Sequence, residues 1–300
     1  MRKIPFIQTS VFTDDRFQFS GNQLATFWNL SEKELSTDEM QGITREMNFS
    51  ETTFVFPTKE HKCIRKVRIF TPGREIPFAG HPTLGTAFVL RNQGIIDSAK
   101  TKAFLELGIG PIAVEFHDSL VKMRQAKPEF LEEFQDTITM AKIIGISSEL
   151  ISQNYPMQFV STGFPFLIVP LTSLEAIQSI NLDIKLLIKT LEGFPSQELL
   201  VFTPNTFYVD SHVHVRMFAP SAGVPEDPAT GSAAGPLGGY LEEYQVLSNH
   251  PRGTTFVIEQ GYEINRPSKL VVQCEYMENE ISEVIVGGEV KLTVEGKFYL

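Results

Sequence analysis

Two stretches of the sequence repeat one another, and this repeat constrains the fold more than any other feature. Residues 68 to 87 read RIFTPGREIPFAGHPTLGTA, and residues 216 to 235 read RMFAPSAGVPEDPATGSAAG. From Arg68 to Pro77, and from Arg216 to Pro225, an arginine, a phenylalanine and two prolines recur at one offset (216 − 68 = 148). A period of about half the chain is too long for a solenoid repeat and predicts the duplication of a whole domain.

The two copies share one local pattern, in which alternating strand residues lead through a Pro and Gly loop into a helix. Beyond the last prolines the letters align His81-Pro82 with Asp227-Pro228, at a slightly shorter offset (227 − 81 = 146). This alignment predicts His81 and Asp227 as helix N-caps, with Pro82 and Pro228 at the first helical position.

Most of the remaining sequence predicts β-strands, and Ser36 to Glu39 forms a capping box that opens a helix to about Met47. We expect an α+β fold of two pseudo-symmetric domains, each a curved, mostly antiparallel sheet packed against one principal helix. A chain of 300 residues also exceeds the usual size of one core. The predicted domains span 1–125 and 126–300, with the final strand free to return to the N-terminal domain.

Charge and hydropathy disfavour several classes of partner. The net charge is −10, and no run of Lys and Arg counters it locally, so we expect no nucleic-acid partner. No stretch approaches the ~18 apolar residues of a membrane span, and the N-terminal segment lacks the apolar core of a signal peptide. A cytoplasmic location without membrane association follows. Cys63 and Cys274 lack metal-ligand spacing and are interpreted as free thiols.

The repeated helix starts are candidates for binding an anion. If both meet at an interdomain cleft, their unsatisfied N–H groups and dipoles would hold a substrate carboxylate or an enolate. Helices with Pro and Gly in the first turn are common and often bind nothing, but two matching copies favour the site.

Glu51 opens a strand rich in aromatic residues, in NFSETTFVF. Partial desolvation by Phe49, Phe54 and Phe56 would raise its pKa toward the value that a general acid–base needs. Considered alone, Glu51 is better explained as a surface residue at a strand end.

Three other patterns are weaker. The spelling GIGPIA, from Gly108 to Ala113, matches a dinucleotide fingerprint, but Pro111 and the strand after it indicate a hairpin. His212 and His214 lack a third metal ligand and are interpreted as exposed strand histidines, so no metal site is predicted. His61 and Cys63 form no recognisable nucleophile pair.

Six motifs, in order over nearly the whole chain, resemble the PhzF-like family of phenazine biosynthesis. They are GNQLAT (21–26), NFSETTFVFP (48–57), RIFTPGREIPFAGHPTLGTA (68–87), STGFPFLIV (161–169), FAPSAGVPEDPATGSAAGPLGGYL (218–241) and EQGYEINRPSKL (259–270). In the last motif, Asn265 stands where the family pattern has glycine. The resemblance implies the diaminopimelate epimerase-like fold, with a sheet wrapped around a central helix in each domain and the site in the cleft between them.

The resemblance also implies isomerase chemistry, in which a glutamate moves a proton between carbons of a dihydro-hydroxyanthranilate. It assigns six positions to the site: the acid–base Glu51, its polar partners His81 and Asp227, the substrate-positioning hydroxyl of Ser232, and the ligand-facing backbone of Gly80 and Gly231. Family members often form homodimers, and we expect one here.

The expected function is a cofactor-independent isomerase of a small carboxylate-bearing metabolite. Related epimerases use two cysteines, one from each repeated loop, but neither loop here contains Cys, so a single carboxylate is favoured. The alternative is a catalytically idle small-molecule-binding or interaction protein that retains the cleft. A nucleotide-dependent oxidoreductase would need the rejected glycine motif to open a helix.

Overall fold

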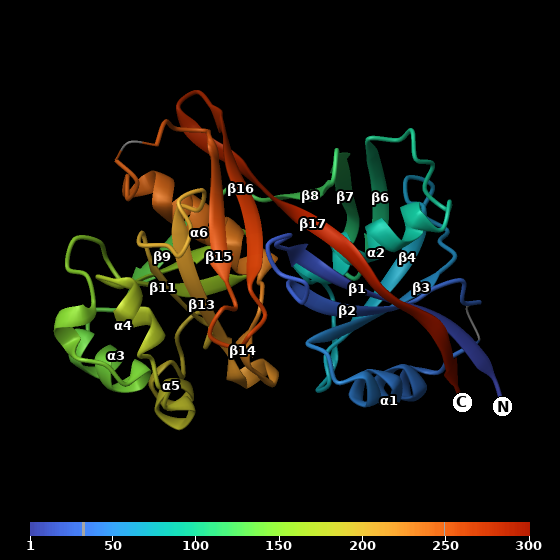
Figure 1. Ribbon diagram of the computed structural model, residues 1–300, viewed down its shortest axis with the longest axis horizontal. Helices are drawn as coiled ribbons and strands as arrows, with labels where there is room; N and C mark the ends of the chain where they lie inside the picture. Colours follow the sequence, from blue (N-terminus) through green and yellow to red (C-terminus); the bar gives the residue numbers. More distant parts are fainter. Residues whose placement is uncertain (32–33, 249) are drawn as a thin grey trace. The chain divides into compact units, whose positions relative to one another are not determined.

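A computed structural model describes residues 1–31, 34–248 and 250–300 of the chain. The chain forms two compact units (Figure 1). Unit 1 comprises Met1–Arg124 and Gly287–Leu300, and unit 2 comprises Gln125–Val286.

Unit 1 is a sheet that closes on itself. Its strands are β1 (Lys3–Thr13), β2 (Asn22–Phe27), β3 (Glu51–Phe56), β4 (Arg65–Phe70), β5 (Glu75–Ile76), β6 (Lys102–Leu107), β7 (Gly110–His117), β8 (Leu120–Gln125) and the end of β17 (Glu280–Tyr299). The pairs β1/β2, β3/β4, β6/β7 and β7/β8 are antiparallel, whereas β2/β3 and β4/β6 are parallel. Because β17 pairs with both β1 and β8, the ring of strands has no free edge there.

Helix α2 (Gly80–Asn92) lies inside this ring of strands (Figure 1). Most of its residues are buried, because strands of the sheet contact it on several sides. Three buried hydroxyls fix its position: Thr86 donates to Thr53 at 2.9 Å, and Thr53 donates to Thr26 at 3.0 Å. Helix α1 (Thr37–Met47) covers the other face of the sheet and packs on an aromatic cluster around Phe54.

Unit 2 repeats this order of strands. Its strands are β9 (Glu129–Glu133), β10 (Gln158–Ser161), β11 (Pro165–Pro170), β12 (Leu199–Thr203), β13 (Val213–Ala219), β14 (Val224–Asp227), β15 (Thr255–Gln260), β16 (Ser268–Met277) and the start of β17. As in unit 1, β10/β11 and β12/β13 are antiparallel, β11/β12 and β13/β15 are parallel, and β15/β16 is antiparallel. The predicted duplication is therefore confirmed at the level of topology.

Helix α6 (Gly231–Glu243) is the buried central helix of unit 2 and packs on β10, β11 and β16. The other helices of the unit are α3 (Thr137–Ile144), α4 (Leu174–Gln178), α5 (Ile184–Thr190) and the 3₁₀ turns η1 (Ser148–Leu150) and η2 (Pro220–Ala222). Helices α3, α4 and α5 contribute to a second apolar cluster on the sheet. Each unit thus has a sheet wrapped around one helix, as the resemblance implied.

An arginine, a phenylalanine and a glutamate take the same arrangement in both copies. Arg68 lies 5.1 Å from the ring of Phe70 and binds Glu75 through two hydrogen bonds of 2.6 and 2.7 Å. In unit 2, Arg216 lies 5.1 Å from the Phe218 ring and binds Glu226 through two bonds of 2.7 and 2.9 Å.

This arrangement corrects the alignment of letters beyond the loop. The copies are separated by 148 residues at the arginines but by 151 at the glutamates (226 − 75 = 151), because unit 2 contains the three-residue turn η2. The same offset relates the first helical residues, Gly80 and Gly231 (231 − 80 = 151). His81 and Ser232 therefore share one helical position, and the alignment of His81 with Asp227 was wrong.

The predicted N-caps were also wrong. The N-cap of α2 is Ala79, and His81 is already the second helical residue. The N-cap of α6 is Thr230, because Asp227 completes β14 by pairing with Met217. Proline misled the prediction, since it is tolerated anywhere in the first helical turn and also in the loop before it.

Two local predictions, a capping box and a hairpin, are confirmed. Ser36 and Glu39 form the predicted capping box of α1. The GIGPIA stretch is a hairpin, in which Leu107 pairs with Gly110. Asn265 has a φ of 57°, the left-handed conformation that favours glycine and that asparagine tolerates best among the other residues.

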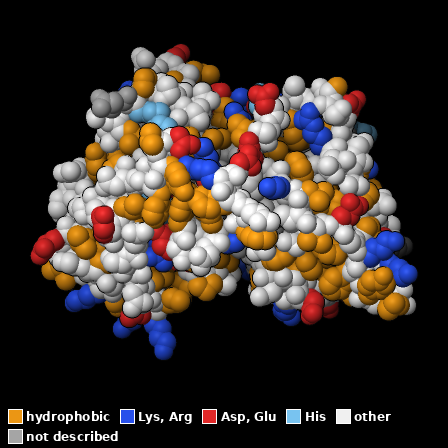
Figure 2. All heavy atoms as spheres, viewed as in Figure 1, with side chains coloured by type: hydrophobic (Ala, Val, Ile, Leu, Met, Phe, Trp, Pro, Cys, Tyr) orange, Lys and Arg blue, Asp and Glu red, His pale blue; other side chains and the backbone are white. Residues whose placement is uncertain are grey.

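Charged side chains of both signs are interspersed on the face shown in Figure 2. The acidic side chains on that face therefore do not form one acidic field. Within the described residues, no helix has the length and apolar character to cross a membrane.

Candidate functional site

The predicted site residues fall into two groups, one in each unit. The structure places Glu51, Gly80 and His81 together in unit 1, where β3 and α2 begin. Asp227, Gly231 and Ser232 lie together in unit 2, where β14 ends and α6 begins.

Glu51 is the first residue of β3 and pairs with Leu24 of the neighbouring parallel strand. Both faces of β3 are buried, and alternation along the strand places Glu51 on the same face as Thr53, which bonds to α2. Its side chain is 15% exposed, and its Oε2 atom lies 3.4 Å from Nε2 of His81. A partly buried carboxylate beside an imidazole is a typical arrangement for general acid–base catalysis.

His81 is buried inside the start of α2. Its Nδ1 atom lies 3.3 Å from Nδ2 of Asn22, which is itself buried on β2. Burial lowers the pKa of His81 to about 3, although a hydrogen bond with the backbone of Gln23 acts in the opposite direction. The imidazole is therefore neutral at neutral pH, and its contact with Glu51 does not neutralise the carboxylate charge.

In unit 2, Asp227 is held by the residues around it. The hydroxyl of Thr230 donates to Oδ2 of Asp227 at 2.5 Å, and the side-chain amide of Gln260 donates to the carbonyl of Asp227 at 2.8 Å. The carboxylate is buried at the end of β14. It is thus fixed by both its side chain and its backbone.

Gly231 and Ser232 form the first turn of α6, where backbone N–H groups lack partners in the helix. The carbonyl of Gly231 accepts a hydrogen bond of 2.8 Å from the buried side chain of Gln125, and Gln125 in turn accepts one from Thr162. Ser232 is half-buried. A positive helix terminus beside a hydroxyl group suits an anionic group of a ligand.

The prediction of two exposed strand histidines was wrong: His212 is half-buried and precedes β13, and the larger departure is at His214. This residue is fully buried on β13, with Nδ1 at 3.3 Å from Glu259 and Nε2 at 2.9 Å from Glu263. Burial alone would lower the pKa of His214, but the hydrogen bonds to the two glutamates outweigh it and raise the pKa above 6.5. Alternation along a strand could not show that both faces of β13 are covered.

The two cysteines and the search for metal ligands bear on the chemistry. Burial raises the pKa of Cys274 to about 12 and also raises that of Cys63, so both thiols are protonated at neutral pH. Neither lies at a helix start. Over the described parts of the chain, no three His, Cys, Asp or Glu side chains are grouped in a way that could hold a metal ion.

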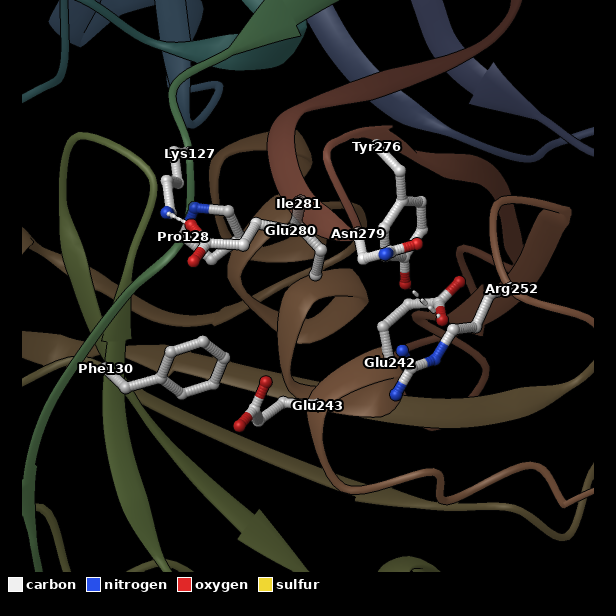
Figure 3. Close-up of a pocket in the computed structure, with 10 residues that line it drawn as sticks. All are labelled: Lys127, Pro128, Phe130, Glu242, Glu243, Arg252, Tyr276, Asn279, Glu280 and Ile281. Carbon is white, nitrogen blue, oxygen red and sulfur yellow. Dashed lines mark hydrogen bonds and ion pairs between the residues drawn. The ribbon is translucent and has the colours of Figure 1, made fainter.

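Unit 2 also has a pocket of about 280 Å³ away from the predicted site residues (Figure 3). Two of its carboxylates are already engaged: Glu242 accepts from the hydroxyl of Tyr276 at 2.7 Å, and Glu280 pairs with Lys127 at 2.6 Å. Both pairs join residues of the pocket lining.

Four residues that contact the site were missed from the sequence: Asn22, Gln125, Thr230 and Gln260. Asn22, Thr230 and Gln260 lie within the motifs that carried the resemblance, but an amide or hydroxyl has no periodic signal that reveals its partner. Gln125 lies outside these motifs, and only the fold brings it to α6.

Comparison with known proteins gives a consistent result. A family model described as "Phenazine biosynthesis-like protein" matches residues 9–296. The trans-2,3-dihydro-3-hydroxyanthranilate isomerase of Pseudomonas aeruginosa is 34% identical over 300 residues, covering 98% of this chain and 99% of the relative. An uncharacterized isomerase of Bacillus subtilis, YfhB, is 34% identical over 263 residues, covering 86% of this chain and 85% of its own length.

Solved structures agree on the fold. A PhzF family protein of Bacillus anthracis superposes with a TM-score of 0.90 at 26% identity, with full coverage of both chains. A probable proline racemase of Agrobacterium radiobacter superposes with a TM-score of 0.63 at 10% identity, covering 99% of this chain and 92% of its own. The second match shows a shared fold alone.

Proposed function

Because the chain belongs to the phenazine biosynthesis-like family and is a PhzF-like isomerase, we propose that it moves a proton between two carbons of a small carboxylate-bearing metabolite, with Glu51 as the acid–base. The observation that carries this proposal is the contact of 3.4 Å between Glu51 and a buried, neutral His81. A neutral imidazole beside the carboxylate adds no positive charge that would weaken it as a base.

The proposed reaction needs no redox step. Glu51 removes a proton from one carbon, and the electron pair of that C–H bond enters a conjugated, enolate-like system. The resulting carboxylic acid then returns the proton to another carbon of the same system, so that one double bond has moved. Because bonds and protons balance within the substrate, no cofactor is consumed.

The other predicted residues bind and orient. In the proposal, His81 forms a hydrogen bond with a polar group of the substrate and keeps Glu51 in place. Asp227, Ser232 and the first turn of α6 suit polar groups of a substrate, including a carboxylate, and Gly80 and Gly231 allow close approach of a ligand to the backbone. Donors that act on developing charge are worth about 3 kcal/mol each.

A name among the relatives supplies the first compound to test. The relative from Pseudomonas aeruginosa is a trans-2,3-dihydro-3-hydroxyanthranilate isomerase, so we propose that compound and other cyclic amino carboxylates as the first probes.

The experiment is deuterium incorporation from D₂O, followed by mass spectrometry, for wild type and Glu51→Gln. We expect turnover of at least one probe by the wild type and loss of turnover in the variant, with the melting temperature unchanged. Turnover by the variant at the wild-type rate would contradict the role of Glu51. Binding of the probes without turnover by the wild type would favour the idle binding protein.

A further inference from the structure

Gln260, Thr230 and Asp227 form a buried set of hydrogen bonds in which the backbone fixes the orientation of the Gln260 amide. The side chain of Gln260 accepts from the backbone N–H of Thr230 at 3.1 Å and donates to the carbonyl of Asp227 at 2.8 Å. These two backbone partners have fixed roles, so they determine which end of the amide is oxygen.

The same amide nitrogen also lies 3.0 Å from the hydroxyl of Thr230 and donates to it. The proton of the hydroxyl is then directed at its other contact, Oδ2 of Asp227, to which it donates at 2.5 Å. A hydroxyl that donates to a carboxyl oxygen at this distance favours the ionised form of the carboxyl group. We propose that Gln260 and Thr230 are positioning residues that hold Asp227 as an ionised acceptor in the isomerase site.

Unit 1 shows that the fold does not require these hydrogen-bonded polar residues. At the positions equivalent to Asp227 and Thr230, unit 1 has Ile76 and Ala79 (227 − 76 = 151 and 230 − 79 = 151). The equivalent of Gln260 follows from the parallel ladders. Lys66 pairs with Glu106 as His214 pairs with Glu259, so the next residues, Leu107 and Gln260, correspond.

Three apolar residues in unit 1 thus become three polar residues in unit 2, and all three of these are bonded to one another. The surrounding strand, loop and helix are otherwise retained, including the arginine and glutamate pair. Burying polar groups stabilises a fold no better than apolar side chains of similar size. A role in the site explains their presence better than a role in folding.

Charged groups on the neighbouring strands are paired with one another. Glu226, beside Asp227 on β14, binds Arg216 of β13. Glu259, beside Gln260 on β15, binds His214 of β13, which also binds Glu263. Glu226 and Glu259 each have a hydrogen-bond partner on β13, and the Thr230 hydroxyl contacts Asp227 directly.

The inference rests on the proposed function for its meaning, but its test does not need a substrate. The carboxyl carbon of Asp227 is followed by ¹³C NMR in protein with labelled aspartate, and Asp227→Asn identifies the resonance. Thr230→Ala introduces the residue that unit 1 carries at this position. We expect it to move the midpoint of the titration upward by about one pH unit, a tenfold change in proton affinity.

Two further variants separate positioning from folding. Thr230→Ser keeps a hydroxyl and should restore the midpoint to within a few tenths of a pH unit. Gln158→Leu is the matched control for Gln260→Leu, because Gln158 is also a buried glutamine that donates to a carbonyl (Leu131) and accepts from a hydroxyl (Tyr244). Gln260→Leu should shift the midpoint, and Gln158→Leu should lower stability without shifting it.

Activity on the dihydro-hydroxyanthranilate probe gives the second measurement. With Thr230→Ala we expect kcat/KM to fall about tenfold and the pH profile to move together with the NMR midpoint. An unchanged midpoint in Thr230→Ala, or Thr230→Ser behaving like Thr230→Ala, would overturn the inference. Failure of the proposed function would appear instead as turnover that survives Glu51→Gln, with the NMR result unaffected.

Discussion

The start of α2 in unit 1 and the start of α6 in unit 2 follow the same repeated sequence pattern but differ in their polar groups. Both retain the arginine, phenylalanine and glutamate that fix the loop before the helix. Unit 1 places a buried imidazole at the second helical position, where unit 2 has Ser232. Unit 2 adds a carboxylate at the end of the preceding strand. The residues that both copies retain support the fold, and the residues that differ give each unit its own polar groups.

The ladders reveal a second pair of equivalent residues. Thr52 pairs with Phe70 as Leu199 pairs with Phe218, so the preceding residues, Glu51 and Glu198, correspond. Glu198 is buried and accepts a hydrogen bond of 3.3 Å from Ser221 in the turn that is unique to unit 2. One glutamate contacts a neutral imidazole and the other contacts a serine hydroxyl, so we expect only the first to act as the acid–base.

The largest expected effect is on catalysis. Glu51→Gln should lower kcat by about 10²- to 10⁴-fold, the usual contribution of a general acid–base. Glu198→Gln should change kcat by less than about threefold, because a buried glutamine can still accept from Ser221. Steady-state kinetics on the same probe measures both. An equally large loss in a folded Glu198→Gln protein would show that unit 2 also supplies an acid–base.

The arginine–glutamate pair occurs in both copies, and we expect the two pairs to contribute unequally to stability. Arg216 and Glu226 are 10% and 11% exposed, whereas Arg68 and Glu75 are 25% and 39% exposed. Arg216→Met leaves a buried carboxylate without its cation and should cost about 3 kcal/mol. Arg68→Met should cost about 1 kcal/mol or less, since solvent screens the pair. Urea denaturation compares them, and equal losses would mean that burial does not distinguish the two copies.

Two buried histidines should give opposite dependences on pH. The pKa of His81 falls from 6.5 to about 3 on folding, so its contribution to stability is complete above pH 6.5 and is lost as the pH falls toward 3. At pH 4.5 the loss should reach about 2 to 3 kcal/mol, since each pH unit contributes about 1.36 kcal/mol. The pKa of His214 is raised, so its contribution is complete below 6.5 and is lost as the pH rises through the raised value.

The measurement is the free energy of unfolding between pH 4.5 and 8 for wild type, His81→Asn and His214→Asn. His81→Asn should flatten the acid side of the stability curve, and His214→Asn should flatten the alkaline side. Variants that flatten the same side would contradict the assigned charge of one histidine.

The smallest effects concern close packing around the central helices. A Cβ at Gly85 would lie 2.6 Å from the end of Leu24 and 2.8 Å from that of Val11, two apolar side chains that can shift. A Cβ at Gly235 would lie 1.9 Å from Oε1 of Gln125, which is bonded to Thr162 and contacts Gly231. Overpacking usually costs about 1 to 3 kcal/mol.

We therefore expect Gly235→Ala to lie at the upper end of that range and Gly85→Ala at the lower end. Thermal denaturation measures both, with circular dichroism to verify that helix content is retained. A larger loss for Gly85→Ala would show that Leu24 and Val11 are held more rigidly than the Gln125 amide.

The correct predictions concern features that depend only on residues close together in the sequence. The capping box of α1 needs only Ser36 and Glu39, and the GIGPIA hairpin follows from Pro111 and the strand after it. The first half of the repeat was also predicted correctly, because Arg68 and Phe70 lie on a strand of constant length in both copies.

The wrong or missing predictions concern features that depend on contacts between residues far apart in the sequence. The three-residue turn η2 changes the offset between the copies, and only the pairing of Glu226 with Arg216 makes the change visible. His214 is buried against Glu259 and Glu263, which follow it by 45 and 49 residues in the sequence. The roles of Thr230 and Gln260 likewise depend on a hydrogen-bond order that no local pattern encodes.

The return of β17 to unit 1 has a consequence for synthesis. Its last residues pair with β1 along almost the whole strand, and the backbones of Arg2 and Leu300 bond to each other at 2.7 and 3.0 Å. During synthesis, β1 and β8 cannot pair with the end of β17 until the residues before it have been made. All residues of unit 2 are synthesised before the end of β17, so unit 2 can fold while the sheet of unit 1 still lacks this strand.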